Sequence, residues 1–433
     1  MHNVLTLARR GAPYSQSEWL FGVIEALAYA WGGRTGVFAS LLPALLLQAL
    51  MLVLIVRRAR TIGGLLLAAI ASLTMSIAMS PRPQIYSFLF FSFGAWAVWA
   101  ARENWAQGRP TFLWPVWGLA VLTLLWGQMH ESALLSSGLI LGALVFARSG
   151  SERKAYLPPL VLALVLAFAH PGAFDASGSF LAGVLNPRVL NTISEWASPN
   201  FHGYPGVLVL PWAVILAPLA VHWGIERKDW MAVAWAVAGA TAMLFAQRFA
   251  PYAVIGVTIV LAAYWPVRTG AAAGAGAPLT VVTLAGTLTL LLTMLLAPGG
   301  AFPNREPMGA IRYLEAHRAR SVFTYYDYGD ALDLYGPPPW LDGRTEIFAP
   351  AAWWPQFTTV SMGEGSLAAF IARYDPGARY VLWPLGTPGA ASLETSRRWQ
   401  VVDKARESLG DLPAEAGVFE AKEPAQPAGE ALR

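Results

Sequence analysis

Ten stretches of this chain are almost entirely apolar and contain no Asp, Glu, Lys or Arg. Most of them reach the roughly 17–25 residues that a helix needs to cross the hydrocarbon core of a bilayer. The pattern predicts an α-helical polytopic membrane protein with about ten transmembrane helices. The predicted spans are 37–56, 62–80, 84–101, 111–129, 132–147, 155–169, 206–225, 230–247, 249–265 and 280–297.

The loops between these spans differ in their content of basic residues. Loops after odd-numbered spans hold eleven Lys and Arg residues, whereas loops after even-numbered spans hold three. Because an excess of Lys and Arg marks cytoplasmic loops, we predict a plasma-membrane protein with both termini outside the cytoplasm. The richer set is Arg57, Arg58, Arg60, Arg102, Arg109, Arg148, Arg153, Lys154, Arg227, Lys228 and Arg268, and the poorer set is Arg82, Arg188 and Arg248.

A short amphipathic pattern precedes the first span. Over residues 18–31, one helical face carries six apolar side chains and the opposite face carries two carboxylates. A helix of this length is too short to cross the bilayer, so we expect it in the outer interface, with its carboxylates pointing away from the apolar face. A surface helix with solvated glutamates is the alternative. The apolar face consists of Leu20, Phe21, Ile24, Leu27, Ala28 and Trp31, and the opposite face of Glu18, Gly22, Glu25 and Tyr29.

The character of the sequence changes after the last predicted span. Apolar runs shorten to strand length, charged residues return, and Pro307 opens a helical pattern. Strand-like runs at 321–326 and 379–383, with a helix-like run at 365–374, predict a small extracytoplasmic α/β domain. The predicted division is an extracytoplasmic segment 1–36, a transmembrane domain 37–297, the α/β domain 298–420, and a disordered tail 421–433 rich in Ala, Pro and Glu.

Composition narrows the class of protein further. Charged residues make up 13% of the chain and the mean hydropathy is +0.46, which excludes an ordinary soluble protein. The net charge is +4, but the arginines form no continuous basic patch, so we expect no nucleic-acid partner. The chain has no Cys, and its histidines lack metal-ligand spacing, so we predict no metal site and no cofactor. A requirement for a divalent cation stays open.

Two turns on the basic-poor side carry groups suited to phosphates and hydroxyls. The first is Pro81-Arg82-Pro83-Gln84, in which Arg82 lies between two prolines. A guanidinium whose backbone is restricted in this way is suited to bind a phosphate. Snorkelling of Arg82 to lipid headgroups is the alternative. In the second, His130 and Glu131 form a turn near membrane depth, where polar groups are costly unless they are used or paired. A turn wetted by headgroups is the alternative there.

Two further groups lie in longer polar segments. The loop 170–205 contains Glu195 next to Trp196, and a carboxylate beside an indole is common at sugar sites. In the C-terminal domain, Asp342 and Arg344 flank a glycine. We interpret this pattern first as a tight turn in which the two side chains pair.

Taken together, the order and spacing of these motifs resemble a group of bacterial polytopic proteins in the GT-C glycosyltransferase-like superfamily, and the likeness covers nearly the whole chain. The motifs are Ser17-Glu18-Trp19-Leu20, Pro81-Arg82-Pro83-Gln84, His130, Asn186-Pro187, Glu195-Trp196, Tyr328-Gly329 and Asp342-Gly343-Arg344.

The resemblance implies transfer of a sugar from a polyprenyl-phosphate carrier to a lipid, glycan or protein acceptor on the outer face. We expect Glu18 as the catalytic base, with Glu195 as second choice, and Arg82 as the phosphate ligand. Trp19 and Trp196 would flank the sugar. The expected substrate-binding set also includes Gln84, His130, Asp342 and Arg344.

The chain departs from this family in two places. Relatives usually have one more span before the first, followed by a loop with an acidic base, and Met1 falls inside that loop. Where relatives tend to have Asn-x-His-Gly-Gly, only His130 carries over. A non-catalytic protein that binds a lipid-linked glycan or a partner protein is therefore the alternative. A transporter is disfavoured because the ten spans contain no charged residue from which to build an ion path.

Overall fold

The computed structural model describes most of the chain, which divides into two units. The described residues are 6–8, 10–11, 18–56, 62–75, 82–109, 113–170, 198–199, 206–265, 307–342, 348, 351–409 and 412–422. One unit comprises Ser15–Leu295, and the other comprises Met1–Tyr14 together with Leu296–Arg433.

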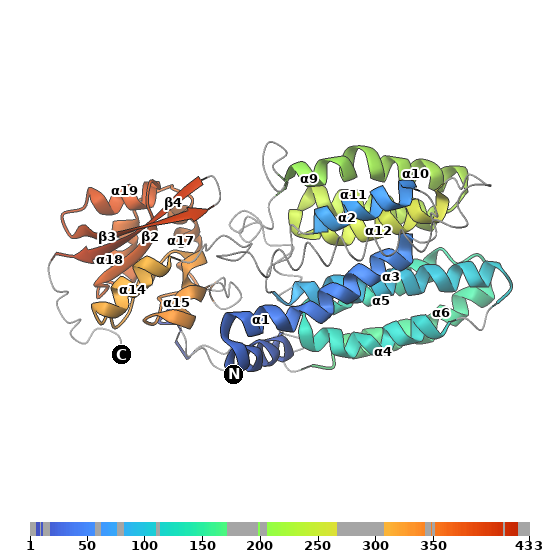
Figure 1. Ribbon diagram of the computed structural model, residues 1–433, viewed down its shortest axis with the longest axis horizontal. Helices are drawn as coiled ribbons and strands as arrows, with labels where there is room; N and C mark the ends of the chain where they lie inside the picture. The colour runs from blue at the N-terminus through green and yellow to red at the C-terminus, as the bar shows by residue number, and fades with distance from the viewer. Residues whose placement is uncertain are drawn as a thin grey trace. The chain divides into compact units, whose positions relative to one another are not determined.

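The first unit is helical. Helices α4, α5 and α6 pack together, as do α2, α10, α11 and α12, and α3 contacts both α4 and α12 (Figure 1). The elements are α1 (Trp19–Val56), α2 (Ile62–Met75), α3 (Gln84–Ala106), α4 (Trp114–Met129), η3 (Glu131–Ala133), α5 (Leu134–Val145), α6 (Gly150–Ala167), α9 (Gly206–Pro211), the π-helix η5 (Trp212–Leu216), α10 (Ala217–Glu226), α11 (Trp230–Phe245), η6 (Gln247–Phe249) and α12 (Ala250–Tyr264).

Four helices in the described part of the chain are long and apolar enough to cross a membrane, which indicates a membrane protein. They are Thr35–Val56, Gln84–Ala106, Gly206–Glu226 and Gln247–Tyr264. The prediction of ten spans is not confirmed. Several apolar runs form helices below spanning length, such as α2 with 14 residues and α5 with 12. The predicted span 280–297 lies outside the described residues.

Helix α1 contains a break between its first third and its apolar remainder. Gly32 and Gly33 have non-helical backbone angles, and Gly33 has φ 57° and ψ −142°. Glycine is the residue that usually adopts such a conformation, because it has no Cβ atom. The break separates residues 19–31, which lie in the predicted amphipathic segment, from the membrane-spanning candidate Thr35–Val56.

The second unit combines helices with a four-stranded sheet. The strand order is β1-β2-β4-β3, with β1 parallel to β2 and the other pairs antiparallel. The elements are α14 (Met308–Ala316), β1 (Phe323–Thr324), η7 (Tyr326–Tyr328), α15 (Gly329–Tyr335), α17 (Trp354–Ser361), α18 (Leu367–Tyr374), β2 (Tyr380–Pro384), α19 (Pro388–Glu394), β3 (Trp399–Leu409) and β4 (Leu412–Ala421).

Successive side chains along a strand point to opposite faces of the sheet, so each face can pack against its own layer of helices. Tyr380 and Leu382 of β2 belong to a core with α14 and α15, whereas Val381 and Trp383 belong to a core with α17, α18 and α19. The start of the chain is also part of this unit, since the Ala8 amide donates to the Trp340 carbonyl at 2.8 Å. Residues 1–14 and the helix that begins at Trp19 are thus assigned to different units.

The backbone at Gly329 packs closely against the backbone of Leu341 and Asp342. A Cβ atom on Gly329 would lie 2.2 Å from the Leu341 carbonyl oxygen and 2.5 Å from the Asp342 Cα.

We expect Gly329→Ala to lower the free energy of unfolding by about 2 kcal/mol or more, because backbone atoms must move. Chemical denaturation of the purified protein measures this change. Gly377→Ala is the control, since a Cβ at Gly377 meets open space; equal effects of the two substitutions would contradict the interpretation.

Candidate functional site

Two of the predicted site residues meet at one end of the helical unit. The Oε1 atom of Glu18, immediately before α1, lies 3.3 Å from the Nε2 atom of His130, at the end of α4. The Glu18 side chain is 31% exposed and that of His130 only 3% exposed. A carboxylate open to solvent therefore lies against a buried imidazole.

This contact corrects the expected orientation of Glu18. The sequence pattern placed Glu18 opposite the apolar face, but Glu18 and Phe21 are three residues apart and share one side of the helix. Phe21 is buried against Tyr86, with ring centroids 6.0 Å apart. The side that packs on the bundle therefore includes Glu18, whereas Leu27 and Trp31 of the predicted apolar face are exposed.

A second contact joins the same two segments. The Trp19 indole N–H donates to Oε1 of Gln128 at 2.6 Å, although the two residues are 109 positions apart in the sequence. The Gln128 amide in turn donates to the Ala169 carbonyl at 2.9 Å. The ring of Trp19 is thus held beside the Glu18–His130 pair by hydrogen bonds that the sequence does not reveal.

His130 belongs to a buried polar network behind Glu18. Its Nδ1 atom lies 2.7 Å from the Ser132 hydroxyl and accepts a hydrogen bond from the Ser132 amide at 3.1 Å. The hydroxyl of Ser132 also contacts Ser87, Trp126 and Tyr252, at 3.0, 3.2 and 3.3 Å. Burial, together with the positive charge of Arg248, holds the pKa of His130 well below its usual value of 6.5. His130 is therefore neutral near pH 7.

Arg82, the predicted phosphate ligand, and Gln84, a predicted substrate-binding residue, lie at the same end of the unit. Gln84 is the first residue of α3, and Ser87 on the next turn contacts Ser132 of the histidine network. Arg82 is exposed just before α3, and the Oε1 atom of Gln84 is buried without a hydrogen-bond partner in the described structure. Arg248, in η6, is near enough to His130 for its positive charge to lower the pKa of the imidazole.

The remaining predicted site residues are placed differently. Asp342 lies in the other unit and its side chain is fully buried, which is the position of a structural residue rather than one open to a ligand. Glu195, Trp196 and Arg344 lie outside the described residues. The site therefore rests on Glu18, Trp19, Arg82, Gln84 and His130.

Sequence reasoning missed four contributors to this site: Ser87, Ser132, Arg248 and Tyr252. Ser132, two residues after His130, carried the only local signal, because Ser and Thr side chains often bond to nearby groups in turns. Ser87 and Tyr252 lie inside apolar segments, and only the packing of α3 and α12 brings them to His130.

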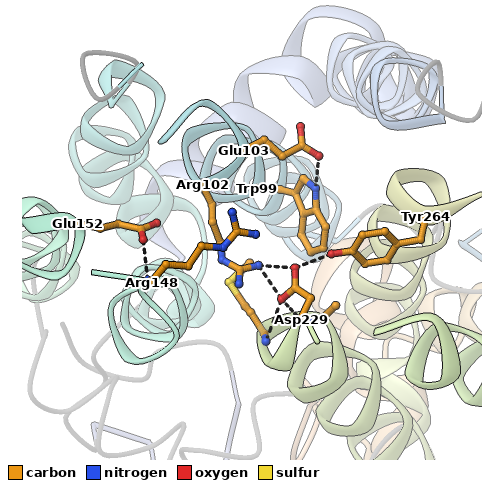
Figure 2. A network of polar contacts seen from close by, with 9 residues as sticks. Trp99, Arg102, Glu103, Arg148, Glu152, Asp229 and Tyr264 are labelled. Atoms are coloured by element: carbon orange, nitrogen blue, oxygen red, sulfur yellow. Dashed lines mark hydrogen bonds and ion pairs between the residues drawn. The ribbon is translucent and has the colours of Figure 1, made fainter. Parts of the chain in front are cut away.

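The opposite end of α3 carries a buried ion pair. The Arg102 guanidinium donates to both carboxylate oxygens of Asp229, at 2.7 and 2.6 Å, and Tyr264 donates to the same carboxylate at 2.5 Å (Figure 2). Asp229 also caps α11 by accepting from the Met231 and Ala232 amides. Every oxygen of this carboxylate has a partner, so the site is structural.

The Asp229 carboxyl is held ionised by these contacts. Burial by itself raises its pKa, but the Tyr264 hydrogen bond and the charge of Arg102 outweigh burial and leave the pKa below its usual 3.8. The sequence interpretation had counted Arg102 only as a marker of the cytoplasmic side. Arg102 is 5% exposed, so packing rather than solvent surrounds it.

The comparisons with known proteins add no relative. No protein-family model matches the chain, and no curated protein matches it. Within the described ranges, no group of three or more His, Asp or Glu side chains is arranged to hold a metal ion.

Proposed function

We propose that this chain is an integral membrane glycosyltransferase of the GT-C type. It transfers a sugar from a polyprenyl-phosphate donor to a lipid, glycan or protein acceptor on the outer face of the plasma membrane. The observation that carries this proposal is the contact of Glu18 with His130 at one end of a bundle of apolar helices. The order of the sequence motifs supports it.

The residues at this end supply the groups that such a transfer needs. An acceptor oxygen forms a bond to the anomeric carbon of the sugar while its proton passes to the Glu18 carboxylate. The bond from that carbon to the phosphate oxygen breaks, and the electron pair leaves with the polyprenyl phosphate. The positive charges of Arg82 and Arg248 stabilise this leaving group. The Trp19 ring offers an apolar face to the sugar.

The proposal is tested with the purified protein in lipid vesicles that contain polyprenyl-phosphate sugars. We expect release of polyprenyl phosphate that depends on the protein and on an acceptor. If the protein binds these donors but converts none of them, a non-catalytic glycan-binding protein replaces the transferase in this account.

The proposed orientation leads to a labelling prediction. Ser198 is exposed and donates to the Phe245 carbonyl beside η6, whereas exposed Ser151 lies at the start of α6. The chain has no Cys, so single substitutions are clean probes. In intact cells, a membrane-impermeant maleimide should label Ser198→Cys and not Ser151→Cys. The reverse pattern would place the Glu18 end in the cytoplasm.

A further inference from the structure

The surroundings of His130 determine which ring nitrogen carries its proton. The Ser132 amide is 3.1 Å from Nδ1, and an amide N–H can only donate. Nδ1 must therefore present its lone pair. A neutral imidazole in this position carries its proton on Nε2.

The other ring nitrogen faces Glu18. Nε2 is buried and has no hydrogen-bond partner within the described structure, yet it lies 3.3 Å from the Glu18 Oε1 atom. A buried N–H without an acceptor is costly, by about 1–3 kcal/mol. A small rotation of the partly exposed Glu18 side chain completes the bond, and catalytic hydrogen bonds commonly tighten when substrate binds.

The partner of Nδ1 is itself fixed by its neighbours. Ser132 is 3% exposed, and its hydroxyl accepts from the Trp126 indole and the Tyr252 hydroxyl. Its own proton is shared between Nδ1 of His130 and the Ser87 hydroxyl, 2.7 and 3.0 Å away. The partners of the Ser132 hydroxyl therefore come from α3, α4 and α12, which makes a rearrangement of Ser132 beside Nδ1 costly.

We propose that His130 is a positioning residue: its Nε2–H holds one oxygen of the Glu18 carboxylate, and Ser132 fixes the tautomer that makes this possible. The inference rests on the proposed function, in which the second oxygen of Glu18 accepts the acceptor's proton. The buried, neutral state of His130 supports it, because an imidazolium would have no lone pair for Ser132.

Two substitutions of His130 distinguish the role of Nε2 from that of Nδ1. In His130→Gln, the amide nitrogen reaches the position of Nε2, so a donor to Glu18 remains. In His130→Asn, the side chain reaches only the position of Nδ1, and Glu18 loses its donor. We expect His130→Asn to lower kcat by about 100-fold with little change in KM, and His130→Gln to stay within about tenfold of the wild type.

A pH profile distinguishes positioning from a merely structural role. A carboxylate that loses a hydrogen-bond donor has a higher pKa, so the acid limb of the kcat profile should move to higher pH in His130→Asn and not in His130→Gln. Equal activity of both variants, or an equal loss in both with an unchanged profile, would overturn the assignment.

A spectroscopic measurement tests the tautomer without any assay of transfer. The ring ¹⁵N spectrum of the labelled full-length protein in lipid contains six histidines, and the signal missing in His130→Gln belongs to His130. We expect a neutral ring with its proton on Nε2 throughout pH 6–8. A ring protonated at Nδ1, or an imidazolium at pH 7, overturns the inference whether or not the protein transfers sugar. If the protein shows the expected spectrum but transfers no sugar, only the proposed function is refuted.

Discussion

Glu18→Gln is expected to reduce sugar transfer by about 10²–10⁴-fold, because an amide cannot accept the acceptor's proton. The substitution keeps the size of the side chain and its distance from His130, so protein level and helix packing should not change. The measurement is the initial rate of polyprenyl-phosphate release in vesicles, compared at equal amounts of folded protein.

A matched control lies two turns further along the same helix. Burial raises the pKa of Glu25 to about 7, so its carboxyl is already partly protonated at neutral pH. Glu25→Gln should therefore leave the rate within about twofold of the wild type, a change worth less than 0.5 kcal/mol. Loss of activity in both variants would point to a general effect on the helix rather than to a base at Glu18.

The second large effect concerns stability. Asp229→Ala should lower the free energy of unfolding by about 3–5 kcal/mol, because it leaves the Arg102 guanidinium buried without its counter-charge. It also removes the cap of α11 and the acceptor of the Tyr264 hydroxyl. Denaturation of the purified protein in detergent measures the change.

The control for this prediction is Glu226→Ala. Glu226 lies near Asp229 in sequence but is 59% exposed, and its ion-pair partner among the described residues is the exposed His222. Its removal should change stability by less than about 0.5 kcal/mol. Similar losses in the two variants would show that the Arg102–Asp229 pair contributes no more than a surface pair.

The Arg102–Asp229 pair also makes stability depend on pH. The pKa of Asp229 is lower in the folded protein than its usual 3.8, so its contribution is present above that value. The contribution is lost as the pH falls through the folded-state pKa. Wild-type protein should therefore lose more stability on acidification than Asp229→Asn does.

The general class of this protein could be predicted from the sequence because it depends on local pattern. Long runs without charge predicted apolar helices, and the return of charge after residue 298 predicted a unit of a different kind. A mostly helical chain with a small sheet is confirmed. The number of spans was not predictable in the same way, since an apolar run does not show where its helix ends.

The hairpin of β3 and β4 shows a second limit. Its strands carry charged residues, such as the consecutive Asp403 and Lys404, and only pairing between the strands makes this segment regular. The predicted strands at 321–326 and 379–383 contain β1, at the edge of the sheet, and β2. They were recognisable because their apolar residues, such as Phe323 and Val381, are buried.

The site could be predicted only in its parts. Polar residues at the ends of apolar segments are recognisable in a sequence, and Glu18, Arg82, Gln84 and His130 all have such positions. That Glu18 meets His130 depends on the packing of α1 on α3 and α4, which no local pattern encodes. The orientation expected for Glu18 was wrong because a helix side can be shared by a carboxylate and a buried ring.

The most direct test of the central claim is mass spectrometry of lipid-linked sugars from a strain that lacks this protein. Without the transferase, the account predicts accumulation of one polyprenyl-phosphate sugar, which the wild-type chain removes and Glu18→Gln does not. An unchanged pool of lipid-linked sugars, or full restoration by Glu18→Gln, would contradict the claim that Glu18 and His130 form a sugar-transfer site.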